Sequence, residues 1–308
     1  MSIEPASPSK TYNQLLRLVQ TMLSGAAGIH GGNPEVYAEQ LFIAAYRKEF
    51  HGILSRMELY IRGAEAAPGT LERELLRMAG LCAAGEPLQY VTGVQSFLDH
   101  EYLVSREVLI PRPETEVLVS TAIEILSKTR EPLLGFELGL GSGVISIELL
   151  ARFSKLKMVA SELSGGAAQL ARENAERILG AEASKSRLVI HPVQDPKSVW
   201  EPAEPEAADF FISNPPYLAG VNEADFQVTQ TEPHQALFAP VADPGYFYRK
   251  LAEILPSLVR QGGYGFFEIP HERSHEIQKM FASISEQVVM KTDLSGRDRV
   301  LCVKIPGQ

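Results

Sequence analysis

The 308-residue sequence has few of the features that mark secreted proteins, membrane-spanning proteins or proteins held together by metal ions. It holds two cysteines, Cys82 and Cys302, which form no CxxC unit and no disulfide framework, so we expect two buried, reduced thiols. No apolar run reaches the length of about 18 to 20 residues that spans a bilayer, and the first residues lack a basic segment followed by an apolar one. These absences predict a cytoplasmic protein with no membrane partner.

Positive charge is also scarce. The sequence carries 29 Lys and Arg residues against 38 Asp and Glu residues, which gives a net charge of −9, and the basic residues are scattered. An acidic chain is poorly suited to hold a phosphate backbone by bulk electrostatics, although a local basic patch could still exist. We therefore expect nucleic acid not to be the main substrate.

The remaining composition, 45% apolar and 22% charged, is typical of a globular chain long enough for two domains. Asn33 and Pro34 have the residue types of an N-cap and a first helical position. Apolar residues recur every three or four positions in four segments, namely 12–23, 34–46, 53–61 and 71–81. The pattern predicts a small helical domain over residues 1–86.

The pattern changes after residue 86. Residues 89–93 and 101–104 are rich in β-branched and aromatic side chains, so we expect a β-hairpin linker over 87–109. Strands and helices then alternate through 110–308, which predicts an α/β fold with a mostly parallel sheet, helices on both faces, and ligands at the carboxyl ends of the strands. The expected strands are 133–138, 158–162, 187–191, 210–213, 263–269, 288–291 and 300–305, and the expected helices are 117–126, 144–153, 166–179 and 246–259.

A glycine-rich turn, FELGLGSG, closes the first of these strands. Gly139, Gly141 and Gly143 permit a tight turn that a ligand can approach closely, but the spacing fits neither the dinucleotide fingerprint nor the phosphate-binding P-loop. Glu137 lies two positions before the first glycine, and Glu162 ends the next strand, where an acid can accept from ribose hydroxyls. A nucleoside without a pyrophosphate fits this pattern better than NAD does, and S-adenosyl-L-methionine is the common cofactor of that kind.

We expect Glu137 to lie near the amino-acid portion of this cofactor, and Asp195, after the third strand, to accept from the adenine amino group. The alternative is a glycine-rich strand–helix turn that binds nothing. The predicted cofactor-binding residues are Glu137, Gly139, Leu140, Gly141, Ser142, Gly143, Glu162, Asp195 and Asn214.

A second motif, Asn-Pro-Pro-Tyr, follows the strand 210–213. Neither Pro215 nor Pro216 has an N–H group, and Pro215 biases Asn214 toward extended geometry, so the loop is stiff and presents acceptors. Two acceptors match the two N–H groups of one amide or exocyclic amine, and holding that nitrogen directs its lone pair at the sulfonium methyl. Tyr217 would form an aromatic wall. We predict Asn214, Pro215 and Tyr217 as catalytic residues, with Pro216 joining them in substrate binding.

These motifs together resemble the HemK/PrmC family, the protein-(glutamine-N5) methyltransferases that modify peptide-chain release factors. The likeness covers nearly the whole chain. The segments that carry it are GEPLQYVTG at 85–93, IPRPETE at 110–116, NPPY at 214–217, and Glu232-Pro233 with Ala236-Leu237.

The resemblance implies a seven-stranded, Rossmann-like class I methyltransferase domain at 110–308, entered through the hairpin linker at 87–109. It also implies that the substrate is the glutamine of a Gly-Gly-Gln motif in a release factor. Asn214 and the backbone carbonyl of Pro215 would hold the glutamine amide, and the helical domain at 1–86 would dock the protein substrate.

Three residues of the cofactor motifs depart from the family pattern. Glu137 and Glu162 stand where Asp is usual, and Leu140 stands where Thr is usual. A cofactor-binding adaptor that has lost activity is therefore one alternative. The NPPY motif alone is shared with DNA and RNA amino-methyltransferases, so a ribosomal-protein glutamine and an exocyclic amine in rRNA or DNA are alternative substrates.

One further motif, HERSH at 271–275, matches the HExxH pattern of zinc proteases. Pro270 places the motif at a helix start directly after a strand, and no histidine follows it as a third ligand. We therefore expect a chance match and no metal site.

Overall fold

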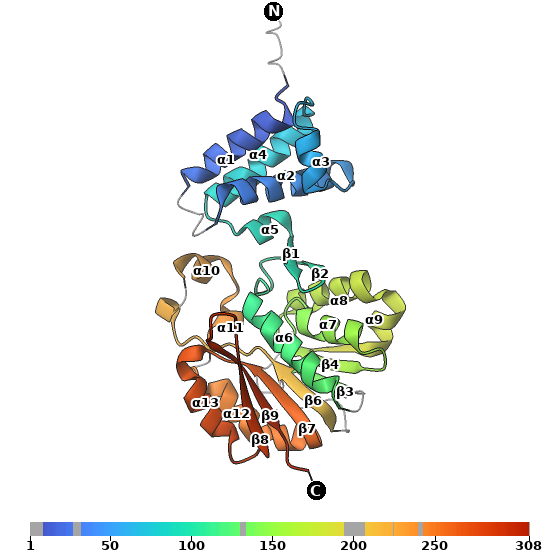
Figure 1. The fold of residues 1–308 in the computed structure, drawn as a ribbon, viewed down its shortest axis with the longest axis vertical. Coiled ribbons are helices and arrows are strands. Elements are labelled where there is room, and N and C mark those ends of the chain that lie inside the picture. The colour runs from blue at the N-terminus through green and yellow to red at the C-terminus, as the bar shows by residue number, and fades with distance from the viewer. Residues whose placement is uncertain are drawn as a thin grey trace, which may run out of the picture. The chain divides into compact units, whose positions relative to one another are not determined.

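The structure is a computed structural model that describes residues 9–26, 32–129, 134–193, 207–223, 225–239 and 243–307. The chain divides into two compact units, Met1–Gly93 and Val94–Gln308, whose elements are labelled in Figure 1. Among the residues described, no helix is both long and apolar enough to cross a membrane. Cys82 and Cys302 are free and buried, as expected.

The first unit is built from helices around one apolar core. The side chain of Thr11 accepts from the backbone N–H of Gln14 and starts the first helix, and the side chain of Asn33 accepts from that of Glu35 and starts the second, so the predicted Asn33 cap is confirmed. The helices are α1 (Tyr12–Ser24), α2 (Pro34–Phe50), α3 (Arg56–Ile61), α4 (Gly69–Ala83) and α5 (Leu88–Thr92). Their core includes Leu15, Val19, Leu41, Phe42, Leu71 and Leu75.

The expected strand over residues 89–93 is wrong, because these residues form α5 and its cap. Gly93 adopts a left-handed conformation with φ of 79° and ends the helix, and its N–H donates to the carbonyl of Gln89. Strand propensity does not decide so short a segment, since Leu88 is buried in the helical core. The hairpin lies just beyond, in β1 (Val94–Phe97) and β2 (His100–Leu103).

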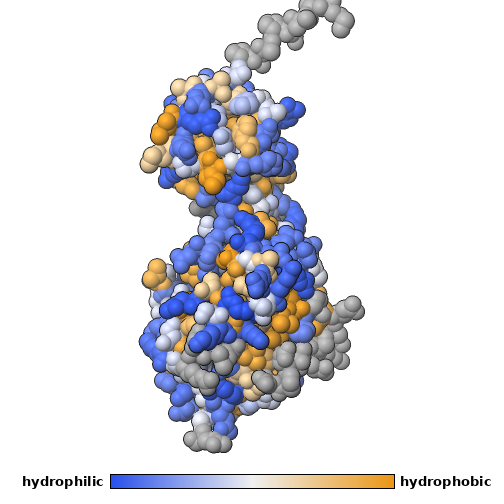
Figure 2. Space-filling view, turned by 90° about the vertical axis from the view of Figure 1, so that its right-hand side faces the viewer, coloured by the Kyte–Doolittle hydropathy of each residue, from blue (hydrophilic) through white to orange (hydrophobic). Residues whose placement is uncertain are grey.

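The surface of the helical unit carries several exposed apolar side chains. Ile53, Met57 and Ile61 are 89%, 73% and 74% exposed, and they lie on or just before α3. Figure 2 shows apolar side chains interspersed with polar ones on this unit.

The second unit contains the predicted seven-stranded sheet. Its strand order is β5-β4-β3-β6-β7-β9-β8; the first five strands pair in parallel, and β9 runs antiparallel to both of its neighbours, β7 and β8. The chain leaves β3 toward one edge and later crosses back to β6 beside it, so the order reverses between these two strands, where ligands bind in such sheets. The strands are β3 (Leu134–Leu138), β4 (Lys157–Glu162), β5 (Leu188–Pro192), β6 (Ala208–Ser213), β7 (Val259–Glu268), β8 (Gln287–Thr292) and β9 (Asp298–Lys304).

Successive side chains of the central strands point to opposite faces of the sheet, so an apolar layer forms on each face. Phe210 and Ile212 of β6 pack in the layer with α6 (Pro113–Leu126), α7 (Val144–Arg152) and α8 (Gly165–Leu179), whereas Phe211 packs in the opposite layer. Helices therefore cover both faces of the sheet, as predicted (Figure 1). The opposite layer is formed by α12 (Tyr246–Leu258) and α13 (Ser274–Phe281).

The helices of the second unit differ from the prediction in one start and in three helices that were not predicted. Helix α6 begins at Pro113 instead of 117. Proline fits the first turn of a helix, because a backbone N–H at that position would have no partner within the helix. The segment before β5 forms the unpredicted helix α9 (Ala181–Arg187), which carries no strong apolar period. Two short helices, α10 (Phe226–Thr231) and α11 (His234–Leu237), follow β6.

Candidate active site

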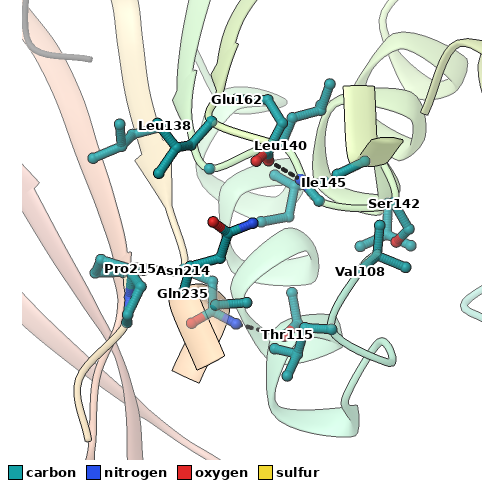
Figure 3. A pocket seen from close by; sticks show the side chains of 18 of the residues that line it. Val108, Thr115, Leu138, Leu140, Ser142, Ile145, Glu162, Asn214, Pro215 and Gln235 are labelled. Atoms are coloured by element: carbon teal, nitrogen blue, oxygen red, sulfur yellow. Dashed lines mark hydrogen bonds between the residues drawn. The ribbon is translucent and has the colours of Figure 1, made fainter. Parts of the chain in front are cut away.

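A cavity of about 170 Å³ opens at the carboxyl ends of β3, β4 and β6, at the point where the strand order reverses (Figure 3). Residues from the glycine turn and from the Asn-Pro-Pro-Tyr loop both line it, so the two motifs share one cavity. The predicted site residues among its lining are Gly139, Leu140, Gly141, Ser142, Glu162, Asn214, Pro215 and Pro216. Glu137, Gly143 and Tyr217 are not among the lining residues, and Asp195 lies outside the described residues.

The glycine turn has a backbone that only glycine adopts without strain. Gly139, Gly141 and Gly143 have φ angles of 77°, 57° and 87°. No atom lies within 4 Å of where a Cβ would stand at Gly139 or Gly141, so the turn leaves open space beside its backbone. At Gly143 a Cβ would lie 2.8 Å from the Cδ1 atom of Ile147 and 3.3 Å from the Cβ atom of Ala171, so close packing adds to the backbone strain that a side chain would cause there.

Glu162 ties the glycine turn to the end of β4. The backbone N–H of Gly141 donates to its Oε2 at 2.8 Å (Figure 3). The backbone N–H of Ser164 donates to its Oε1 at 2.9 Å. Each carboxylate oxygen has a second lone pair, so both oxygens can still accept from a hydroxyl group of a ligand. The carboxylate therefore both shapes the turn and presents acceptors to the cavity.

Glu137 lies deeper and is only 3% exposed. The hydroxyl of Ser146 donates to its Oε2, while its Oε1 has no hydrogen-bond partner among the described residues. Burial raises the pKa of this carboxyl to about 8, although the hydrogen bond from Ser146 acts in the opposite direction. At neutral pH the group is therefore mostly protonated.

The hairpin supports the glycine turn from the other side. The buried side chain of Asn174 in α8 donates to the carbonyls of Leu103 at 3.0 Å and Ser142 at 2.9 Å, and its Oδ1 accepts from the N–H of Leu103 at 2.7 Å. One side chain thus fixes β2 to the turn. The sequence contained no signal for this contact, because Asn174 is one polar residue in a helix.

Asn214 is held by contacts that the sequence did not predict. Its Nδ2 donates to Thr115 Oγ1 at 3.2 Å, and Thr115 Oγ1 donates to Glu268 Oε2 at 2.7 Å. The Oδ1 of Asn214 accepts no hydrogen bond from the described residues and is available to a ligand. Ser213, directly before it, donates to the carbonyl of Leu138 at 2.8 Å and fixes β6 to β3.

Tyr217 packs beside the apolar layer behind the loop instead of lining the cavity. Burial raises the pKa of its phenol well above the ordinary value, so the group stays neutral. The aromatic wall that we expected in the cavity is supplied in part by Phe247, which does line it.

The IPRPETE segment is joined to the chain that follows the Asn-Pro-Pro-Tyr loop. The guanidinium of Arg112 pairs with the buried carboxylate of Glu232, which also accepts from the N–H of Ile110 at 3.0 Å. Both segments are recognisable motifs, but their pairing across 120 positions could not be read from either. Lining residues that the sequence did not predict include Glu107, Val108, Thr115 and Gln235.

The HERSH motif lies apart from the cavity. His271 is in a 3₁₀ turn over His271–Arg273, whereas His275 lies in α13, and the Nδ1 of His271 accepts from the N–H of Asp298 at 3.1 Å. In the part of the chain that the structure describes, no three His, Cys, Asp or Glu residues gather as metal ligands.

The model of the methyltransferase small domain family matches residues 115–236, which include both motifs of the cavity. A release factor glutamine methyltransferase from Chlorobaculum tepidum is 31% identical over 258 residues, covering 80% of this chain and 84% of that protein. Another, from Bacteroides thetaiotaomicron, is 33% identical over 233 residues, covering 75% and 80%. The solved hMettl16 catalytic domain in complex with MAT2A 3′UTR hairpin 6 has a TM-score of 0.50 at 14% identity over 76% of this chain and 84% of that one, a likeness of fold alone.

Proposed function

Because the chain belongs to the family of release factor glutamine methyltransferases, we propose that it methylates the glutamine of the Gly-Gly-Gln motif in a peptide-chain release factor. The methyl group goes from S-adenosyl-L-methionine to the side-chain amide nitrogen, N5. The observation that carries this proposal is the carboxamide of Asn214, whose carbonyl oxygen is available at the cavity that the glycine turn also lines.

The residues at the glycine turn fit S-adenosyl-L-methionine. Gly139 and Gly141 leave open space beside the turn, and Glu162 retains acceptor capacity for the two hydroxyls of a ribose. The unpartnered Oε1 of Glu137 is an acceptor for the amino group of the cofactor, whose positive charge would favour the ionised form of this carboxyl over the protonated form that burial favours. We also propose Leu140, Ser142 and Gly143 of the turn as cofactor-binding residues, together with Asp195. When bound, the cofactor supplies an electrophilic methyl group on a sulfonium.

The Asn-Pro-Pro-Tyr loop acts on the nucleophile. An amide nitrogen is weakly nucleophilic because its lone pair is delocalised into the carbonyl. The Oδ1 of Asn214 and the backbone carbonyl of Pro215 accept from the two N–H groups of the substrate amide, which holds the nitrogen and aims its lone pair into the cavity. The same acceptors stabilise the positive charge that develops on the nitrogen before its proton leaves to solvent. Pro216 and Tyr217 keep the loop rigid from behind.

The protein partner is a release factor and not a nucleic acid, in agreement with the net charge of −9. The helical residues 1–86 dock the substrate, residues 87–109 link them to the catalytic part, and residues 110–308 form the class I methyltransferase domain. The protein acts in the cytoplasm, where release factors meet the ribosome.

The test is transfer of labelled methyl from S-adenosyl-L-methionine to a purified release factor, with mass spectrometry to locate the methyl group. We expect one methyl on the Gly-Gly-Gln glutamine, no transfer to a release factor in which that glutamine is Ala, and a loss of at least 100-fold in Asn214→Ala. Because Asn214 is also a proposed cofactor-binding residue, calorimetry on Asn214→Ala should show cofactor binding weakened but still present, which separates a lost acceptor from a lost fold.

The other substrates and the adaptor predict different results. Preference for ribosomal protein, rRNA or DNA over the release factor would contradict the proposal and identify the alternative. Cofactor binding without transfer to any of them would support the inactive adaptor. Absence of cofactor binding would mean that Glu137, Leu140 and Glu162, the three departures from the family pattern, prevent it.

A further inference from the structure

Three polar side chains from distant parts of the chain meet behind the proposed substrate site. Thr115 lies in the first turn of α6, Asn214 directly follows β6, and Glu268 ends β7. Asn214 Nδ2 donates to Thr115 Oγ1 at 3.2 Å, and Thr115 Oγ1 donates to Glu268 Oε2 at 2.7 Å. Thr115 and Glu268 are 4% and 3% exposed, so water cannot readily replace these bonds.

The chemistry of the chain of hydrogen bonds sets its direction. A threonine hydroxyl has one proton, and an ionised carboxylate has none. When Glu268 is ionised, the proton of Thr115 must go to it, so Thr115 can only accept from Asn214. The atom of Asn214 that faces Thr115 must then be its NH₂ group, and the carbonyl oxygen must face the other way.

We propose that Thr115 and Glu268 are positioning residues that fix which way the Asn214 carboxamide faces, so that its carbonyl oxygen and not its NH₂ group meets the substrate amide. This inference rests on the proposed function. A flipped carboxamide would place N–H donors against the N–H donors of the substrate and could not hold the nitrogen. Outer partners of this kind, where they orient metal ligands, change activity by about 10- to 100-fold when removed.

The surroundings keep the Glu268 carboxylate in place. Its own backbone carbonyl accepts from the hydroxyl of Tyr248 at 2.8 Å, and β7 pairs with β9 there through Val300. Tyr248 is a neutral phenol because burial raises its pKa, and burial does the same for Tyr217, which also lies near this carboxylate. Neither phenol adds a charge to the group.

Charged side chains act on Glu268 from two sides. Burial is the largest effect and raises the pKa of this carboxyl to about 7, while the hydrogen bond from Thr115 lowers it. Glu114 raises the pKa further, and Arg299 and Arg112 lower it. The acceptor that orients Thr115 is thus fully charged only on the alkaline side of about pH 7.

The test compares Thr115→Val, which removes the hydroxyl at nearly constant shape, with Thr115→Ser, which keeps it. Thr121→Val is the matched control, since Thr121 is a buried threonine of the same helix away from the cavity. We expect Thr115→Val to lower kcat about 10- to 100-fold with cofactor affinity unchanged, and Thr115→Ser and Thr121→Val to stay near wild type. A Thr115→Val enzyme with kcat within twofold of wild type would overturn the inference, as would an equal loss in Thr121→Val.

The pH profile supplies a second readout if Thr115→Val does not fold. In wild type, kcat should rise with pH through about 7 as Glu268 ionises, and Glu268→Gln, which offers an acceptor oxygen at every pH, should lose that step. A step that persists unchanged in Glu268→Gln contradicts the assignment.

A third measurement separates this inference from the proposed function. The side-chain N–H signals of Asn214, assigned by their loss in Asn214→Asp, should exchange slowly with solvent in wild type and faster in Thr115→Val. This outcome supports the orientation even if the release factor is not the substrate. Equal exchange in both proteins would refute it even if the release factor is methylated.

Discussion

Replacing Glu137 by Gln tests how the ionisation of one buried carboxyl group limits stability. Burial raises the pKa of Glu137 from its ordinary 4.5 to about 8 in the folded protein. Between these values the folded chain holds one proton more than the unfolded chain. The stabilising contribution is complete below pH 4.5 and is lost as the pH rises through about 8.

The size of the effect follows from the shift. One pKa unit corresponds to about 1.4 kcal/mol, so this group alone should lower the free energy of unfolding by on the order of 2 to 3 kcal/mol between about pH 5 and about pH 7. Gln does not ionise and lacks this dependence. Its carbonyl oxygen can accept from Ser146, which leaves its NH₂ group in the place of the unpartnered Oε1. The cost of burying that NH₂ group does not vary with pH, so it shifts the whole curve without changing its slope.

The assay is urea denaturation of both proteins at several pH values without cofactor. The difference in free energy of unfolding, Glu137→Gln minus wild type, should increase with pH by the stated amount. Subtracting the two proteins removes the titration of all other groups. A difference that stays constant within about 0.5 kcal/mol, an ordinary error of such extrapolations, would refute the reasoning.

Ser146→Ala should shift the pKa of Glu137, whereas Glu137→Gln abolishes its titration. The hydrogen bond from Ser146 lowers the pKa of Glu137, so its removal should raise that pKa further. The loss of stability with rising pH should then extend to higher pH than in wild type. If Ser146→Ala instead flattens the dependence, Glu137 is not the titrating group.

Three other substitutions test the framework of the site. Gly143→Ala should lower the free energy of unfolding by about 1 to 3 kcal/mol, because φ is 87° and a Cβ would clash. Gly165→Ala is the control, since a Cβ there meets open space and should not lower it. Urea denaturation measures both effects. Phe210→Ala should cost about 3 to 5 kcal/mol by the same assay, because the ring is fully buried between strands and helices. Glu232→Gln should raise KM for the release factor more than KM for the cofactor, because Arg112 loses its ion pair beside the substrate loop. Steady-state kinetics measures both constants, and an equal increase in the two would contradict this prediction.

The sequence predicted the parts of the fold that depend on local pattern. Strands such as β3 and β6 are apolar runs that end in a glycine turn or a proline loop, and both features are visible within a few residues. The prediction failed at α5, where Tyr90, Val91 and Thr92 have high strand propensity but lie in a helix, because Leu88 is buried in the core of the helical unit. Tertiary packing overrides propensity most easily in segments this short.

The site was predictable where its residues form motifs and not where they act at a distance. Asn214 was predicted because it follows a strand and precedes two prolines, and Glu162 because it ends the strand after the glycine turn; both line the cavity. Thr115 and Glu268 were missed because a threonine in a helix and a glutamate at the end of a strand become informative only when 153 positions of chain fold to bring them together. No pattern in the sequence shows that neighbouring residues fix the orientation of a side chain.

The strand order has a consequence for the sequence of events during folding. The glycine turn and Glu162 belong to β3 and β4, which are neighbours along the chain and in the sheet. Glu268, by contrast, contacts Thr115 across 153 positions of chain, so it reaches its place only after a long stretch of chain has closed. A refolding chain should therefore recover binding of S-adenosyl-L-methionine before it recovers methyl transfer. A partly folded enzyme would then bind its cofactor without transferring the methyl group.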